Sequence, residues 1–562
     1  MIRRVLLSAA LLGAAGFTGC QEHHEGHAAE QGLSSRTKDG RLSPELKNLG
    51  RYHRAVTTAS AEAQKFFDQG LILTYGFNHA EAVRSFREAQ RLDPECGMAY
   101  WGEALALAPN INDPAIGPDR EQQGYQAIKK ALERKSGALP VEAALIDAMA
   151  RRYDGAEKPD RERLNRTYAE AMKAAYAAHP ADPDVAVLYA DAVMNTMPWD
   201  YWSRDGKPRT GIPEIVEALQ AVIARTPDHP GANHIFIHAV EASPDPDRAV
   251  ASADRLGGLV PGAGHLVHMP AHIYIRVGRY GDAVDANVRA IAADEDYITQ
   301  CRAQGIYPAA YYPHNIHFLF AALSMSGRSR ETMDAARKVA SKHSHADMQQ
   351  PGFGFAHLLK ATPLLAMVRF GKWDEALAEP DPGESMRFVQ AVRHYARGLA
   401  YLRKGDPAAA EKELAGLRAA AAGPALAGLK ILEMNDLATV ARIPENLLAA
   451  EIAAARQDLP SALRLAQKAV ETDDGLKYSE PPDWPLPPRQ TLGAILLQAG
   501  RAREAERVFR ADLARHRDNG WSLRGLTASL RAQGRHSEAM AAEERFRKAW
   551  SQADIRTESA RL

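Results

Sequence analysis

Apolar residues recur at helical spacing along nearly the whole chain. From about residue 46 onward, Ala and Leu are interleaved with Arg and Glu, and short clusters of Gly, Pro and Asp interrupt the pattern. Alternation with a period of two, which is typical of half-buried strands, is rare. Because Gly and Pro commonly mark helix ends, the pattern predicts a series of helices joined by short turns. The predicted fold class is all-α.

The interruptions are themselves periodic. A glycine is followed five residues later by an alanine at Gly278/Ala283, Gly371/Ala376, Gly405/Ala410, Gly500/Ala505 and Gly534/Ala539. The second and third of these pairs are 34 residues apart, and so are the fourth and fifth. A constant spacing of this length indicates that one unit, a pair of helices, is repeated along the chain.

The segment from Phe66 to Pro94 shows the repeated unit most completely. Small and aromatic residues stand at the spacing of the tetratricopeptide pattern: Gly70, Ala82, Phe86 and Ala89 here, and Gly493, Ala505 and Phe509 near the C-terminus. The sequence therefore resembles the tetratricopeptide-repeat superfamily. The resemblance implies a right-handed superhelical solenoid of antiparallel helix pairs, with the first helix of each pair lining a concave binding face.

Two stretches interrupt the repeat, and each is a candidate insertion or hinge. They are Met194 to Pro213, which contains several aromatic residues, and the proline-rich Tyr478 to Pro488. The predicted solenoid divides into an N-terminal part over residues 46–360 and C-terminal repeats over residues 361–555.

The histidines of the central region keep the register of the repeat. Seven of the 20 histidines fall between residues 234 and 317. His234 and His268 are 34 residues apart, as are His238 and His272, which is one repeat. His265 to His314 and His268 to His317 are both offsets of 49 residues, equal to the offset between Gly278 and Gly327. Equivalent positions in neighbouring repeats are expected to face one groove.

Imidazoles gathered in one groove predict a metal site. The candidate ligands are His234, His238, His265, His268, His272, His314 and His317. Neutral imidazole suits zinc, copper and iron, and Glu241, on the stripe of His234 and His238, is a candidate ligand or general base. Seven histidines suffice for two ions. Pro270 falls inside the helix expected to carry His268 and His272, so it is expected to kink that helix or delay its start.

The histidines also admit other interpretations. In a non-catalytic scaffold they would be hydrogen-bonding residues of a groove that docks a peptide or an envelope protein. A haem site fits less well, because many of the histidines would be redundant and no Cys-x-x-Cys-His motif occurs. Solenoids of this class are usually docking scaffolds, so the fold does not choose between an enzyme and a scaffold.

The N-terminus carries an export signal. Two arginines precede a short apolar run that ends at Phe17-Thr18-Gly19-Cys20. This ending resembles a bacterial lipobox, which implies a signal peptide over residues 1–20, acylation of Cys20 and a membrane anchor. Gln21 resembles an outer-membrane sorting signal. The predicted location is the outer membrane, facing the periplasm, or the medium if Cys20 is not acylated. Residues 21–45 are predicted to be a flexible tether.

Composition narrows the function further. The 70 basic residues equal the 70 acidic ones, which removes the strong positive field of most nucleic-acid-binding proteins. No phosphate-binding loop, Gly-x-Ser-x-Gly elbow or His-Glu-x-x-His pair occurs. The sequence thus predicts an exported, lipid-anchored solenoid with a histidine-bound transition metal ion, and it indicates no reaction type.

Overall fold

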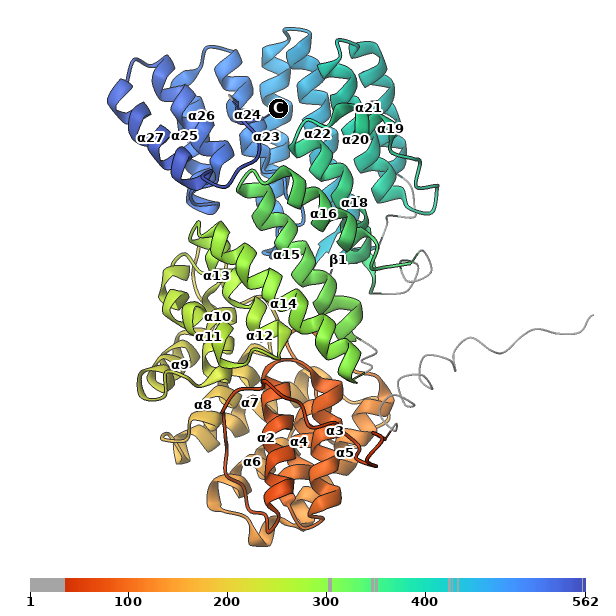
Figure 1. Cartoon of the computed structure of the whole chain (residues 1–562), viewed down its shortest axis with the longest axis vertical. Coiled ribbons are helices and arrows are strands. Elements are labelled where there is room, and N and C mark those ends of the chain that lie inside the picture. Colours follow the sequence, from red (N-terminus) through yellow and green to blue (C-terminus); the bar gives the residue numbers. More distant parts are fainter. Residues whose placement is uncertain are drawn as a thin grey trace, which may run out of the picture.

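The computed structural model is a stack of helix hairpins, running from the orange N-terminal end to the blue C-terminal end (Figure 1). It describes residues 36–301, 306–344, 348, 352–422, 426, 428–431, 434–557 and 559–561. The signal peptide predicted over residues 1–20, with Cys20, and the tether up to residue 35 lie outside the described residues.

Successive helices pair along the stack. In the N-terminal part the pairs are α2 (Ala61–Tyr75) with α3 (His79–Leu92), α4 (Gly97–Leu107) with α5 (Pro118–Glu133), α6 (Pro140–Ala150) with α7 (Arg161–Ala178), and α8 (Pro183–Met194) with α9 (Ile212–Arg225). The central pairs are α10 (Pro230–Val240) with α11 (Val250–Leu259), the short α12 (Gly264–His268) and α13 (Pro270–Arg276) with α14 (Tyr280–Cys301), and α15 (Tyr312–Met325) with α16 (Ser329–Ala340).

The pairing continues to the C-terminus. The pairs are α18 (Gly354–Arg369) with α19 (Trp373–Ala378), α20 (Arg387–Arg403) with α21 (Pro407–Ala421), α22 (Leu437–Ala455) with α23 (Leu459–Gly475), α24 (Pro488–Gln498) with α25 (Ala502–Arg515), and α26 (Gly520–Ala532) with α27 (His536–Ala549). Two-residue strands β1 (Lys430–Ile431) and β2 (Asn435–Asp436) pair before α22. The prediction of an all-α helical-repeat solenoid is confirmed.

The same packing holds the repeats together at both ends of the chain. A Cβ atom added at Gly70 or Gly102 would lie 2.7 or 2.3 Å from the ring of Phe86, so this ring fills the space between the two glycines. Phe509 occupies the equivalent position, with Cβ distances of 2.4 Å from Gly493 and 2.3 Å from Gly525. One aromatic ring clamped between two glycines therefore joins each of these repeats to the next.

Two structural contacts lie close to the predicted domain boundaries, which stay predictions. Ser43 is buried and donates a hydrogen bond to Glu81 of α3 (2.6 Å), so the packed body includes residues before residue 46. The predicted division at residue 360 falls inside α18, whose turns continue from Gly354 to Arg369, and the two parts of the stack share this helix. Local composition does not reveal either contact.

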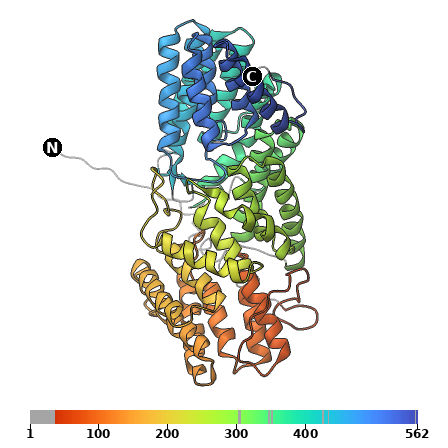
Figure 2. The same ribbon diagram turned by 90° about the vertical axis from the view of Figure 1, so that its left-hand side faces the viewer.

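The C-terminal repeats also touch the middle of the chain. The indole N–H groups of Trp521 and Trp550 donate to the carbonyls of Ser324 (3.0 Å) and Met325 (3.2 Å) at the end of α15. The carboxylate of Asp554 accepts from the backbone N–H of Ser329 (2.6 Å). Figure 2 shows the blue C-terminal helices beside the green central ones. Within the described residues, no helix combines the length and apolar character needed to span a bilayer.

Candidate metal centre

The central helices present their histidines from short, sharply limited segments. Helix α10 starts at Pro230 with His229 as its cap, and it carries His234 and His238 one turn apart. Helix α12 then ends before Met269, and Pro270 is the first residue of the next helix, α13. This break is the late start expected from Pro270, and it places His268 and His272 on different helices.

The first histidine triad consists of His234, His238 and His265. One ring nitrogen from each lies within 4.8 Å of the others, and all three side chains are buried. The closest approach is 3.2 Å, between Nε2 of His234 and Nε2 of His265. Three imidazoles at these distances are a suitable set of ligands for one ion.

The second triad consists of His268, His272 and His314. Its ring nitrogens also lie within 4.8 Å of one another, and Nε2 of His268 is 3.0 Å from Nε2 of His272. His268 and His272 are buried, whereas His314 is partly exposed. The second triad therefore has an accessible edge on the side of α15.

The two triads are adjacent. The ring centroids of His238 and His272 are 5.7 Å apart, and those of His265 and His268 are 6.0 Å apart. Two ions bound by the triads would therefore be neighbours in one centre.

Glu241 joins the two triads. Nδ1 of His238 donates to its Oε1 atom (2.7 Å), and Nδ1 of His272 donates to its Oε2 atom (2.5 Å). Burial alone would raise the pKa of Glu241, but the electrostatic interaction with His272 and the hydrogen bonds from both histidines lower it to about 2. The carboxylate is thus anionic and fixes the Nδ1–H tautomer of each ring.

Two other ligands are held in the same way. Nδ1 of His234 donates to the carbonyl of Tyr75 (2.7 Å). Nδ1 of His268 donates to Oδ1 of Asn287 (2.7 Å), whose amide is oriented because its Nδ2 donates to the carbonyl of Ala283 (2.7 Å). In these rings Nδ1 carries the hydrogen, and Nε2 keeps its lone pair.

The Nε2 atoms of His268 and His272 lie close together. When both rings are neutral with their hydrogens on Nδ1, neither Nε2 atom can donate to the other, and a cation lying against both removes their repulsion. Two nitrogens bound to a tetrahedral zinc ion lie about 3.3 to 3.4 Å apart, close to the observed 3.0 Å. The spacing of this pair is compatible with a shared cation.

Burial favours the neutral form of five of these histidines. It lowers the pKa of His238, and it holds the pKa of His234, His265, His268 and His314 well below the ordinary value. Among the described residues, Nε2 of His238 and Nδ1 of His265 are buried without a hydrogen-bond partner. Neutral rings with free lone pairs are the form of histidine that binds metal ions.

Aromatic rings cover both triads. Phe77 lies over the first triad, with its ring centroid 4.7 Å from that of His234, and Phe318 lies over the second, 4.4 Å from that of His272. Trp199 meets His238 edge-on at 5.2 Å. Phe77 and Trp199 both have left-handed backbones, with φ of 58° and 64°. Such conformations cost about 1–3 kcal/mol each and cluster at functional sites.

His317 is placed differently from the other predicted ligands. Its ring stacks on Phe320, with centroids 5.8 Å apart, and it belongs to neither triad. Burial lowers its pKa to about 4. The structure thus brings six of the seven predicted histidines and Glu241 together.

Sequence reasoning missed the residues that orient and cover the ligands. Asn287, Phe77 and Phe318 carry no distinctive motif, and the carbonyl of Tyr75 is a backbone group. The sequence did point to Trp199, because this residue lies in one of the two stretches that interrupt the repeat.

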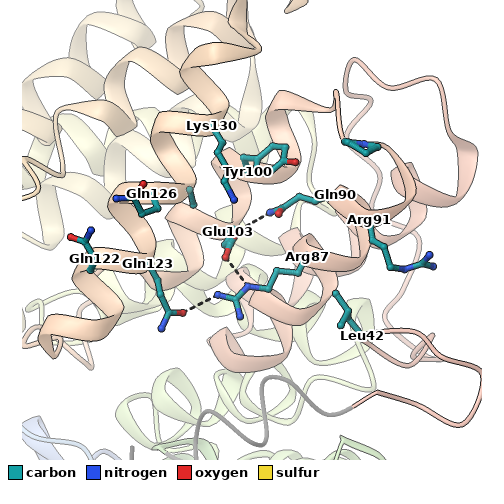
Figure 3. Close-up of a pocket in the computed structure, with 12 residues that line it drawn as sticks. Leu42, Arg87, Gln90, Arg91, Tyr100, Glu103, Gln122, Gln123, Gln126 and Lys130 are labelled. Atoms are coloured by element: carbon teal, nitrogen blue, oxygen red, sulfur yellow. Dashed lines mark hydrogen bonds and ion pairs between the residues drawn. The ribbon is translucent and has the colours of Figure 1, made fainter.

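A separate groove of about 560 Å³ runs along α3, α4 and α5 (Figure 3). Glu103 accepts hydrogen bonds there from Arg87 and Gln90, both at 2.7 Å, and Arg87 also donates to Gln123 (2.9 Å). No histidine of the triads lines this groove. It is a surface feature distinct from the candidate metal centre.

A scan of the sequence against protein-family models finds no match, and a search among curated proteins finds none. Similar solved structures include the human IFIT1 dimer with m7Gppp-AAAA, at 10% identity and a TM-score of 0.32, covering 78% of this chain and 87% of that one. Another is the APC/C hetero-tetramer Cut9-Hcn1, at 12% identity and a TM-score of 0.28, covering 88% and 76%. Both contain tetratricopeptide repeats. Such low scores carry no argument about the site.

Proposed function

We propose that this protein is an exported, lipid-anchored solenoid that binds two transition metal ions in its central histidine cluster. The observation that carries the proposal is the pair of Nε2 atoms of His268 and His272, 3.0 Å apart, with both Nδ1 atoms hydrogen-bonded to acceptors. Zinc, copper and iron all accept such ligands. The anchor at Cys20 and the outer-membrane location rest on the N-terminal sequence alone.

The ligand count favours a reactive centre over a closed structural one. Structural zinc sites use four protein ligands, whereas catalytic sites use three and keep one position for water or substrate. Each triad supplies three imidazoles. Ions held in this way act as Lewis acids or redox centres, so the proposed role is a metal-dependent enzyme.

Within this proposal Glu241 is a positioning residue. Both of its oxygens already accept hydrogen bonds from ligand imidazoles, and the side chain is fully buried. A base must be free to take a proton from the reacting group. We therefore assign Glu241 to orienting His238 and His272 rather than to proton transfer.

Elemental analysis tests the proposal. The full chain, treated with a chelator and reconstituted with Zn²⁺, Cu²⁺ or Fe²⁺, is expected to hold two ions. His238→Ala removes one ligand and one partner of Glu241, so the stoichiometry should fall towards one ion. His536→Ala, at an exposed position on α27, is the matched control and should keep two. Less than about a tenth of an ion per chain would favour the scaffold that docks a peptide or envelope protein.

A further inference from the structure

The two stretches that interrupt the repeat converge on the metal centre. The first lies between α8 and α9, and its Trp199 contacts His238. The second lies between α23 and α24, and the hydroxyl of its Tyr478 is 3.5 Å from Oε2 of Glu241. Arg204 of the first stretch donates a hydrogen bond to the carbonyl of Gly475, next to the second. Figure 2 shows the yellow loop of the first stretch reaching the light-blue helices.

The second stretch brings a carboxyl group to the centre. Tyr478 donates a hydrogen bond to Oε1 of Glu480 (2.7 Å). The other oxygen, Oε2, is buried and has no hydrogen-bond partner among the described residues. A buried carboxylate oxygen without a partner is costly, so its retention here calls for a compensating charge.

The charged groups around Glu480 indicate which positive charge would balance its carboxylate. The guanidinium of Arg276 lies 5.5 Å from the Tyr478 ring and donates to the carbonyls of Glu241 and Ser243. In the metal-free protein Arg276 contributes one positive charge and Glu241 one negative charge to this region. Two divalent ions would add four positive charges to this region. Besides Glu241, Glu480 is the carboxyl group among the residues named above that can offset part of this charge.

Burial raises the pKa of Glu480 to about 7, whereas the charge of Arg276 and the hydrogen bond from Tyr478 act to lower it. A cation at His272 therefore favours the carboxylate form, and by linkage the carboxylate favours the cation.

On this basis, and resting on the proposed function, we propose that Glu480, held by Tyr478, is the second carboxylate of the metal centre. It ligates neither ion; it supplies negative charge, and Tyr478 holds it next to Glu241. The C-terminal repeats thereby contribute a positioning residue to a site whose ligands all come from the central helices.

The test uses Co²⁺ as a spectroscopic probe in the chelator-treated full chain. Glu480→Gln keeps the shape and removes the charge. We expect it to weaken Co²⁺ binding about tenfold, the lower limit for residues that support metal ligands, and to shift the visible absorption bands. Asp483→Asn is the matched control, because Asp483 is a buried acid of the same stretch that pairs with Asn435 (2.7 Å). This control should bind as the wild type does.

Tyr478→Phe provides a second variant in case Glu480→Gln does not fold, as judged by circular dichroism. It removes only the hydroxyl between the two carboxylates, and it should weaken binding and shift the bands in the same direction. The inference is overturned if folded Glu480→Gln and Tyr478→Phe both bind Co²⁺ like the control, with unchanged bands. Wild-type protein that takes up no Co²⁺ would instead refute the proposed function itself.

Discussion

Replacing Glu241 by Gln tests the core of the candidate centre. The substitution keeps the volume of the side chain but removes its charge and one acceptor. The amide nitrogen must then face an Nδ1–H group of His238 or His272, each of which now donates to a carboxylate oxygen at 2.7 or 2.5 Å. One imidazole is forced to move its hydrogen to Nε2 or to lose its partner, and in the first case that ligand can no longer bind an ion.

The size of the effect follows from the pKa of Glu241. The pKa is lowered from the ordinary 4.5 to about 2, which corresponds to about 3 kcal/mol of stabilisation by the ionised form. Because the folded-state pKa lies below the unfolded one, this stabilisation is fully present above about pH 4.5 and is lost as the pH falls towards 2. At pH 7 the free energy of unfolding of Glu241→Gln should therefore be about 3 kcal/mol lower than that of the wild type. Near pH 2 the two proteins should have nearly the same free energy of unfolding.

Urea denaturation of the metal-free proteins at pH 7 and at pH 3 measures this difference. Glu170→Gln, at an exposed position of α7, is the control and should change the unfolding free energy by less than about 0.5 kcal/mol. With metal present, Glu241→Gln should also lower the affinity about 10- to 100-fold. A Glu241→Gln protein as stable as the control at pH 7, or equally destabilised at both pH values, would refute the reasoning.

The remaining predictions concern other parts of the centre and the stack. His314→Ala should lose one of two bound ions whereas His317→Ala should lose none, since only the first ring belongs to a triad; elemental analysis decides, and equal losses would contradict the assignment. Gly525→Ala places a Cβ 2.3 Å from Phe509 and should lower the unfolding free energy by about 1–3 kcal/mol. Gly281→Ala, which meets no atom within 4 Å, should not destabilise the protein in the same urea titration. Free Zn²⁺ at 100 times its dissociation constant should stabilise the protein by about 2.7 kcal/mol, and a chelator should reverse the rise in melting temperature; a melting temperature indifferent to both would contradict metal binding to the folded state.

The fold was predictable because its contacts are local and repeated. Gly70 and Gly493 mark the same clamp around an aromatic ring, and such a pattern is visible wherever it recurs at a fixed interval. The grouping of the histidines was predictable for the same reason, since equivalent positions of neighbouring repeats face one another. Their metal-binding role stays a prediction.

The partition of the ligands could not be predicted. His265 and His268 are three residues apart on α12, yet they belong to different triads. The contact between Tyr478 and Glu241 joins residues 237 positions apart, and no periodicity encodes it. The left-handed backbone of Phe77 is equally invisible, because Phe rarely adopts it.

The attachment of Trp521 and Trp550 to the end of α15 has a mechanical consequence. A solenoid that is free at one end can stretch and twist, because each repeat contacts only its neighbours. Here the C-terminal repeats are attached to the middle of the solenoid, at Ser324 and Met325 of α15. The same helix carries His314 at its other end. The C-terminal coil and the accessible edge of the second triad are therefore connected by a single helix, α15.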